Sequence, residues 1–499
     1  MKYSRILQAG HILLMIAVLS ACAPQVDNQQ KELAETSEAE LTLQAEVELT
    51  LQPTRPVYQP GELVEYTVQT GDTLDALAAH FNTTVDEIRK ENNVLPETTS
   101  TLPPGLPLKI PIYYQALWGS SYQIMPDCLF PNGPAQSDFD VIQFVEDQPG
   151  WFKNYTAYTG SKTRQGGELI DYLVTNFSVS PRVLLAIIEY QTDALSTPVP
   201  IDEEENPYPL GFEDDLHVGL YNQLLLAANL LNNGYYGWRT GNLGEFELAN
   251  GTLIVPDPWQ NAATIALQYY YGFVLDGEAF QIATHGPGFV QTYNDLFGEV
   301  WTACEAHIPG SLSQPAFILP FEDDKPWAYT GGPHTGWGLG EPFAAIDFAP
   351  PNTEGGCKPT DLYATALADG VIARKGIATA ALDLDGDGNE QTGWVVFYLH
   401  LATDSIPPVG TYLQQGDRIG LPSCEGGRST GTHVHIARKY NGEWIPADSA
   451  LPFNLDGWVA INGNKDYQGF LKRFGTTITA SVSGDVTSQI HREIEKNSP

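Results

Sequence analysis

The sequence predicts a multidomain α+β protein, and three observations support this class. The chain has 499 residues, which is more than one ordinary core holds, so about three domains are expected. A hydrophobic content of 42% with 11% aromatic residues is typical of globular proteins. The residue pattern also changes twice, to helical spacing near Tyr113 and to short strands divided by Gly, Pro and Asp near Gln314. We therefore expect a small βααβ module, a helical middle domain and a C-terminal domain built on an antiparallel β-sheet.

The chain is strongly acidic. Its formal net charge is −36, from 61 acidic and 25 basic residues. Binding to nucleic acid requires a basic surface that releases counterions from phosphates, so this class of partner is excluded. The charge fits a soluble body that works outside the cytoplasm.

Residues 1–22 have the pattern of an export signal. Lys2 and Arg5 precede a short apolar core, and Leu19-Ser20-Ala21-Cys22 follows it. This ending resembles the lipobox of bacterial lipoproteins, which implies cleavage before Cys22 and lipidation of that residue. The apolar run is short for a transmembrane span, although an uncleaved anchor is the alternative. Either reading exports the bulk of the protein. Lipidation would place it in the cell envelope, anchored on the outer side of the cytoplasmic membrane or in the periplasm or outer membrane.

Cysteine usage agrees with export. With Cys22 lipidated, four cysteines remain, and an even number in an exported chain suggests two disulfides with three alternative connectivities. We favour the connectivity in which each bond lies within one domain, and free thiols are the alternative. The favoured pairs are Cys128 with Cys304 and Cys357 with Cys424.

Residues 23–63 predict an acidic linker. They are rich in Glu, Gln, Thr and Pro and poor in large apolar residues, so they cannot form a core. The linker would hold the following domains away from the membrane.

Residues 64–112 predict a compact βααβ unit. A strand at 66–68 and the turn Gly71-Asp72 lead into two helices, and a second strand follows at 108–110. Threonines precede both helices as caps. The apolar positions of the helices are Leu74, Leu77, Ala78, Phe81, Val85 and Ile88.

This segment resembles a LysM domain. It matches the opening Y-x-V-x-x-G-D-T-L, the central Asn92-Asn93 and the closing P-G-x-x-L-x-I-P. The resemblance implies binding of N-acetylglucosamine-containing glycans, peptidoglycan or chitin. It places them in a shallow groove between the first strand–helix loop and the second helix–strand loop.

Residues 113–310 predict a helical domain of uncertain role. Several stretches carry apolar residues at helical spacing behind Ser or Asp caps. One of them, SPRVLLAIIEYQTDAL, is loosely similar to the stretch of lytic transglycosylases that carries the catalytic glutamate, here Glu189. A buried carboxyl could act as a general acid. The following residue is Tyr190 instead of the usual Ser, so a carboxylate at the end of a helix is the alternative.

The C-terminal region, residues 311–475, contains an ordered series of polar motifs among short strands. His334 and Asp347 come first, and the stretch A-L-A-D-G-V from Ala366 to Val371 follows. Tyr398 to Leu401 brings His400, and Gly-Asp-x-Ile-Gly follows at 416–420. The series ends in S-T-G-T-H-V-H at 429–435. Because residues i and i+2 of a strand share a face, His433 and His435 would lie side by side.

In this order the motifs resemble lysostaphin- and LytM-type zinc metallopeptidases, whose fold is an antiparallel duplicated-hybrid-motif sheet. The resemblance implies one Zn²⁺ per domain, held by His334, Asp347 and His435, with His400 and His433 as catalytic histidines. Two imidazoles and one carboxylate with an open fourth position are typical of a catalytic zinc site. The family usually has a shorter interval between its first His and its Asp than the one here, so Glu341 is a rival carboxylate.

Two further expectations concern the same region. Asp383, Asp385 and Asp387 alternate before Gly388 as in a calcium loop, although Trp394 stands where the bidentate Glu belongs, so an acidic hairpin tip is the alternative to Ca²⁺. Residues 476–499 are expected to be a tail.

Together these features predict a peptidoglycan hydrolase, a zinc endopeptidase that cleaves wall peptide stems or cross-links and is targeted by its LysM module. The alternatives are a non-catalytic wall-binding or hydrolase-activating envelope protein, and a bifunctional hydrolase with a transglycosylase-like middle domain. The expected partners are peptidoglycan and, through a lipid anchor, the membrane.

Overall fold

The computed structural model describes residues 56–115, 118–302, 304–322, 325–351 and 355–492. The predicted lipobox at Leu19 to Cys22 and most of the predicted linker lie outside the described residues. Within the described residues, no helix combines the length and the apolar character needed to cross a membrane.

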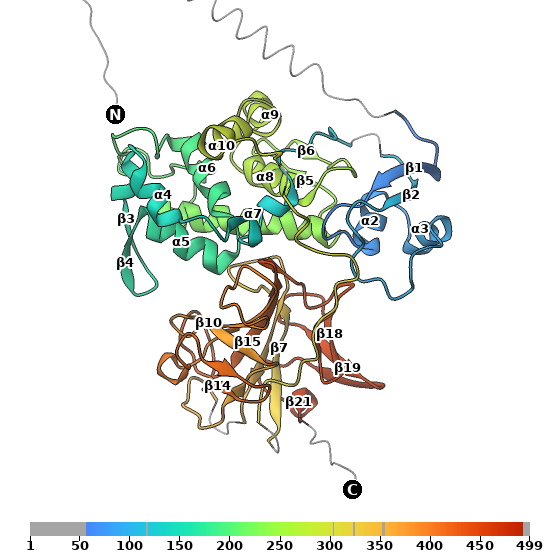
Figure 1. Cartoon of the computed structure of the whole chain (residues 1–499), viewed down its shortest axis with the longest axis vertical. Helices are drawn as coiled ribbons and strands as arrows, with labels where there is room; N and C mark the ends of the chain where they lie inside the picture. The colour runs from blue at the N-terminus through green and yellow to red at the C-terminus, as the bar shows by residue number, and fades with distance from the viewer. Residues whose placement is uncertain (1–55, 116–117, 303, 323–324, 352–354, 493–499) are drawn as a thin grey trace, which may run out of the picture. The chain divides into compact units, whose positions relative to one another are not determined.

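The first folded module is the predicted βααβ unit (Figure 1). Strand β1 (Glu62–Thr67) pairs antiparallel with β2 (Pro107–Ile112), and helices α2 (Leu74–His80) and α3 (Val85–Glu91) lie between them in sequence. The hydroxyls of Thr73 and Thr84 cap the two helices by accepting from backbone amides. The apolar positions pack inward to form one core. This arrangement confirms the fold predicted for the module.

The middle region is helical, as predicted. Its core is formed by helices packed side by side, with α7 and α8 in extensive contact. Two small hairpins, β3–β4 and β5–β6, were not predicted. The helices are α4 (Val141–Asp147), α5 (Gly166–Phe177), α6 (Pro181–Thr192), α7 (Leu220–Arg239), α8 (Ala262–Gly272), α9 (Gly277–His285) and α10 (Phe289–Phe297). The hairpin strands are β3 (Thr156–Thr159), β4 (Lys162–Gln165), β5 (Phe246–Glu247) and β6 (Leu253–Ile254).

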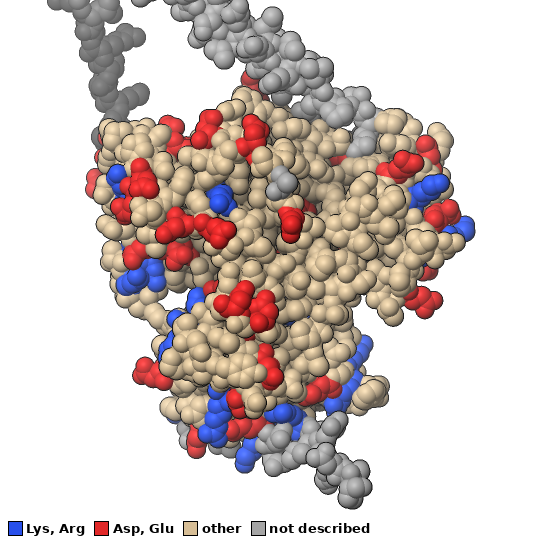
Figure 2. Space-filling model, in the orientation of Figure 1, with Lys and Arg blue, Asp and Glu red and all other residues tan. Residues whose placement is uncertain are grey.

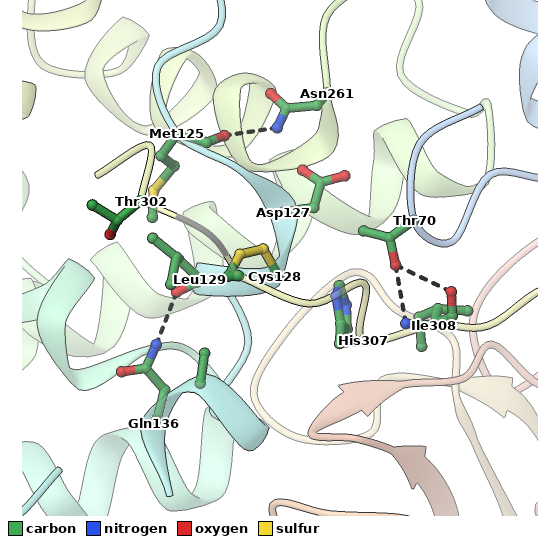
Figure 3. The surroundings of a disulfide bond; sticks show 12 residues. Thr70, Met125, Asp127, Cys128, Leu129, Gln136, Asn261, Thr302, His307 and Ile308 are labelled. Atoms are coloured by element: carbon green, nitrogen blue, oxygen red, sulfur yellow. Dashed lines mark hydrogen bonds between the residues drawn. A yellow bond between two sulfur atoms is a disulfide. The ribbon is translucent and has the colours of Figure 1, made fainter. Parts of the chain in front are cut away.

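The two disulfides form as predicted. Cys128 bonds to Cys304 across 176 residues, and this bond ties the 3₁₀ turn Asp127–Leu129 to the segment after α10 (Figure 3). Cys357 bonds to Cys424 within the C-terminal domain, with a Cα–Cα distance of 5.7 Å. Each bond therefore stabilises one domain, chiefly by restricting its unfolded chain.

The C-terminal domain is built on a nine-stranded sheet with the order β13-β10-β11-β12-β15-β8-β7-β21, in which β16 also pairs with β15. All its pairs are antiparallel, as predicted. The strands are β7 (Trp327–His334), β8 (Ala345–Ala349), β10 (Gly370–Lys375), β11 (Ala380–Asp383), β12 (Trp394–Leu399), β13 (Tyr412–Leu413), β15 (Val434–Tyr440), β16 (Glu443–Trp444) and β21 (Gln489–Ile490). The short pair β9 (Ala364–Thr365) and β14 (Arg418–Gly420) lies beside this sheet in the same domain.

The end of the chain corrects one prediction, because residues 476–492 are not a tail. A four-stranded sheet of β17 (Asn454–Leu455), β18 (Trp458–Asn462), β19 (Gly469–Arg473) and β20 (Thr476–Thr479) reaches past residue 475. Ile490 on β21 then pairs with Trp327 and is only 1% exposed. The apolar residues Ile478 and Ile490 are isolated in a polar stretch, so their burial could not be inferred from periodicity.

Acidic side chains dominate the surface charge. Figure 2 shows them over the visible face, with the basic side chains interspersed among them. This distribution agrees with the acidic net charge.

Candidate metal centre

Three adjacent strands bring the predicted ligands together. His334 ends β7, Asp347 lies in the middle of β8, and His435 is the second residue of β15. Asp347 is directly opposite His435 in the β8–β15 register and opposite Gly331 on β7. Because Gly331 has no side chain, the Asp347 carboxylate occupies the space that a Cβ at that position would fill, with Oδ2 only 2.4 Å away.

The three ligand atoms converge on one point. His334 Nε2 lies 2.9 Å from His435 Nδ1, and both nitrogens lie 3.3 Å from Asp347 Oδ1. Ligands at about 2.0–2.1 Å from a tetrahedral Zn²⁺ are about 3.3 Å apart, so these separations suit that ion. All three side chains are buried.

The second nitrogen of each imidazole is held by a backbone carbonyl. His334 Nδ1 lies 2.8 Å from Gly332 O, and His435 Nε2 lies 3.1 Å from Gly336 O. A carbonyl only accepts, so each of these nitrogens carries a proton, and the opposite nitrogen of each ring faces Asp347, where it could bind a metal ion once it is deprotonated. This is the arrangement by which outer-shell partners orient metal-binding histidines.

The carboxylate also has the chemistry of a ligand. Asp347 Oδ1 is buried and has no hydrogen-bond partner among the described residues. Burial alone would raise the pKa of Asp347, but the neighbouring His334 and His433 outweigh it and hold the pKa well below the usual value. A buried, ionised carboxylate oxygen beside two imidazole lone pairs fits a divalent cation.

The two predicted catalytic histidines flank this centre. His433 Nε2 lies 3.8 Å from Asp347 Oδ2, and its Nδ1 donates to Gly431 O. His400 Nδ1 donates to Glu425 O at 2.7 Å, and its ring centroid lies 4.5 Å from that of His433. Burial, followed by the neighbouring His433, lowers the pKa of His400 to about 4, so the imidazole is neutral at pH 7.

The long interval between His334 and Asp347 forms a loop that reaches the helical domain. The backbone amides of Leu339 and Glu341 donate to the side-chain carbonyls of Asn229 and Asn233 on α7, both at 2.7 Å. Gly338 and Gly340 allow this approach, because a Cβ at either position would lie within 2.3 Å of these asparagine oxygens. The extra residues therefore make an interdomain contact and leave Asp347 in place on β8.

Glu341, the rival carboxylate, lies elsewhere. Its Oε2 accepts from the Phe343 amide at 3.1 Å and its Oε1 from Asn242 at 3.4 Å. It is not among the residues whose ligand atoms group with those of His334 and His435.

A cavity of about 880 Å³ opens over the centre. It is lined by the histidines and by the glycine-rich segment 426–431. Helix α7 provides another part of the lining through Asn222, Leu225, Leu226 and Asn229. The helical domain and the C-terminal domain therefore both contribute to the space in which a substrate would lie.

Tyr467 is a cavity residue that sequence reasoning missed. Its ring stacks on His334 with centroids 4.1 Å apart. It lies between β18 and β19, and its amide donates to Pro333 O. It belongs to no polar motif, so the sequence carried no signal for its position.

Glu189 lies apart from this centre, at the end of α6. Its Oε2 accepts from the Leu195 amide at 2.6 Å, beside a separate cavity of about 220 Å³. The carboxylate thus forms a hydrogen bond typical of a helix end. A glycosidase role for Glu189 gains no support from this geometry.

The aspartates of the predicted calcium loop do gather at one hairpin tip. Ligand oxygens of Asp383, Asp385 and Asp387 lie within 4.8 Å of one another. These carboxylates also accept hydrogen bonds from nearby backbone amides, as at an ordinary acidic turn. The Gly388 amide, for example, donates to Asp383 Oδ2 at 2.8 Å. Calcium binding there stays a prediction.

Two family models match parts of this chain. The LysM domain family matches residues 66–111, and the family described as LasA, N-terminal domain, matches residues 123–311. Protease LasA of Pseudomonas aeruginosa strain PAO1 is 24% identical over 383 residues, which cover 72% of this chain and 87% of that protein. Protease LasA of a second strain is also 24% identical, over 65% of this chain and 78% of that protein.

The alignment with LasA extends over most of that protease, and the buried His-Asp-His group supplies the centre that such an enzyme needs. The chain is similar to this protease over most of its length and also contains a match to the LysM domain family.

Solved structures of such peptidases are also similar. The M23 metalloprotease pseudoalterin from the deep sea is 23% identical, with a TM-score of 0.30, over 36% of this chain and all of that one. The catalytic domain of lysostaphin from Staphylococcus simulans is 22% identical, with a TM-score of 0.17, over 25% of this chain and 89% of that one.

Proposed function

We propose that this protein is a zinc-dependent endopeptidase that cleaves the peptide part of peptidoglycan. The observation that carries the proposal is the convergence of His334 Nε2, Asp347 Oδ1 and His435 Nδ1 in a buried site under a cavity. These three atoms would hold the ion. A zinc ion with three protein ligands and one open position supplies Lewis acidity and a nucleophile at neutral pH.

The remaining residues of the centre would position the substrate and move protons. His433 Nε2 faces the cavity near Asp347 and would take up or return a proton during attack on the peptide carbonyl. His400 is neutral, and because its Nδ1 donates to Glu425 O, its Nε2 presents a lone pair; it would bond the oxygen of the scissile group only after taking up a proton at Nε2. The cavity walls would exclude water around the reacting bond.

His433→Ala and His400→Ala are expected to keep most of the bound zinc and to lower turnover by roughly 10² or more, because each removes proton transfer or oxyanion stabilisation. The measurement is zinc content by atomic absorption together with the rate on a soluble peptide substrate. The control is His491→Ala, since His491 is exposed and does not line the cavity. Loss of zinc from either variant would instead make that histidine a ligand.

The substrate class is tested by the groups that digestion liberates. Hydrolysis of wall peptides releases new amino groups, whereas glycan hydrolysis releases reducing sugars. We expect zinc-loaded protein to release amino groups only, and a chelator to stop the release. Anhydro or reducing sugars that disappear in Glu189→Gln would support the bifunctional alternative, and protein that binds zinc without releasing any of these products would support the non-catalytic one.

The LysM domain supports a location at the cell wall. We infer that it binds N-acetylglucosamine-containing glycan and thereby concentrates the peptidase on peptidoglycan. We also infer lipid anchoring through Cys22, on the motif Leu19 to Cys22.

The anchoring proposal predicts that Cys22→Ser shifts the protein from the membrane fraction to the soluble fraction, or leaves an unprocessed precursor of higher mass. Immunoblots of fractionated cells would show either result. An unchanged distribution and an unchanged mass would refute lipidation at this residue.

A further inference from the structure

A short segment that leads from the helical domain into the C-terminal domain lies across the LysM domain. We call residues 307–312 the strap. At its first end, the Ile308 amide donates to Thr70 Oγ1 at 3.0 Å, and the same hydroxyl lies 3.2 Å from Ile308 O (Figure 3). Thr70 belongs to the loop between β1 and α2.

The other end of the strap is held by the loop between α3 and β2. Thr101 Oγ1 donates to Pro309 O at 2.7 Å and accepts from the Leu312 amide at 3.0 Å. Ser100 Oγ donates to Leu312 O at 2.6 Å, and the Ser311 amide donates to Thr101 O at 2.8 Å. The strap therefore bridges the two loops between which a LysM domain of this type would take its glycan.

The strap is also fastened to both neighbouring domains. Ile308 and Leu312 are buried in an apolar cluster with Ile445 of the C-terminal domain. His307 Nε2 lies 2.6 Å from Glu443 Oε2 on β16, and β16 pairs with β15, the strand of His435. Upstream, the Cys128–Cys304 disulfide ties the start of the strap to the helical domain (Figure 3).

We propose that the strap occupies the glycan groove of the LysM domain in cis, so that strap docking and glycan binding exclude each other. The inference rests on the glycan binding proposed above. The hydroxyls of Thr70, Ser100 and Thr101 are engaged by strap carbonyls and amides, and these are the polar groups that the acetamide and hydroxyls of N-acetylglucosamine would need. A wall glycan would displace the strap and thereby loosen the contact between His307 of the strap and Glu443.

Gly310 offers a way to lift the strap without changing the loops that hold it. A Cβ at Gly310 would lie 2.6 Å from Pro103 Cα, a backbone atom that cannot yield easily. Gly310→Ala should therefore raise the population of undocked strap. Gly244→Ala is the matched control, because Gly244 is exposed and a Cβ there would meet nothing within 4 Å.

The first measurement is calorimetric titration of each full-length protein with the β-1,4-linked tetramer of N-acetylglucosamine. Since the apparent affinity is reduced by the fraction of molecules with an open groove, Gly310→Ala should bind at least about tenfold more tightly than wild type. Gly244→Ala should bind like wild type. Equal affinities for wild type and Gly310→Ala would overturn mutual exclusion and leave glycan binding intact.

The second measurement needs no variant, so it decides the matter if Gly310→Ala does not fold. Hydrogen exchange of the wild type is followed with and without the tetramer at saturation. The strap amides of Ile308, Ser311 and Leu312 should exchange faster with the sugar, while the loop at 98–104 gains protection. If the loop gains protection while exchange of the strap amides is unchanged, mutual exclusion is wrong and glycan binding by the LysM domain still stands. Absence of any sugar binding to wild type and Gly310→Ala overturns LysM glycan binding and the proposal with it.

Discussion

His435→Ala is expected to lose bound zinc and peptidase activity together. The substitution removes one of three converging ligand atoms and leaves only those of His334 and Asp347. Loss of an outer-shell partner alone typically costs 10- to 100-fold in metal affinity or activity, so loss of a ligand should cost more than about 100-fold. Metal content per chain and the rate on a soluble peptide measure both effects.

Asp347→Ala and Glu341→Ala form the matched pair for the carboxylate ligand. Asp347→Ala should behave like His435→Ala, whereas Glu341→Ala should keep its zinc, because Glu341 binds Phe343 N and Asn242 away from the centre. Full zinc occupancy in Asp347→Ala with loss in Glu341→Ala would transfer the ligand role to Glu341.

The second large effect concerns the buried charge of Glu443. Its Oε1 lies 3.3 Å from Arg239 Nε, and its Oε2 accepts from Tyr235 and lies beside His307. Glu443→Ala would leave Arg239 buried with Asp127 as its remaining acidic partner, so we expect a loss toward the lower end of about 3–5 kcal/mol in the free energy of unfolding. Denaturant titration followed by circular dichroism measures it.

An exposed ion pair provides the control for this substitution. Arg418 and Glu322 pair at 2.7 Å with side chains 61% and 32% exposed, so Glu322→Ala should cost no more than about 1 kcal/mol. Equal small losses in both variants would show that Glu443 does not stabilise the fold.

The same carboxylate predicts a pH dependence. Burial would raise the pKa of Glu443, but Arg239, His307 and Tyr235 together outweigh it and lower the pKa to about 2, below the ordinary value of 4.5. The Glu443 contribution is therefore fully present above pH 4.5 and is lost as the pH falls toward 2. In Glu443→Gln the stability should fall less steeply over this interval than in the wild type.

Much of the metal centre could be predicted because its residues lie in strands and in local motifs. His433 and His435 follow the two-residue period of a strand, and this places both imidazoles on the side of Asp347. The roles of these residues stay predictions until they are measured. Tyr467 was missed because it approaches His334 from a distant loop, and no local pattern encodes that approach.

The contacts between domains could not be predicted from the sequence. Arg239 and Glu443 are 204 residues apart, and each looks like a solvated surface charge when only its neighbours in sequence are considered. The loop after His334 appeared as a departure from a family pattern, although Asn229 and Asn233 on α7 give it a partner. Such pairings depend on how complete domains pack, which neither periodicity nor spacing records.

The most direct test of the central claim is mass analysis of peptidoglycan digested by the zinc-loaded wild type in ¹⁸O-labelled water. Hydrolysis of a wall peptide bond places one labelled oxygen in the new carboxyl terminus and leaves the disaccharide units intact. The proposed function predicts such labelled peptide fragments, and their absence when His435→Ala replaces the wild type. Fragments labelled only in their sugars, or labelled peptides released equally by His435→Ala, would contradict it.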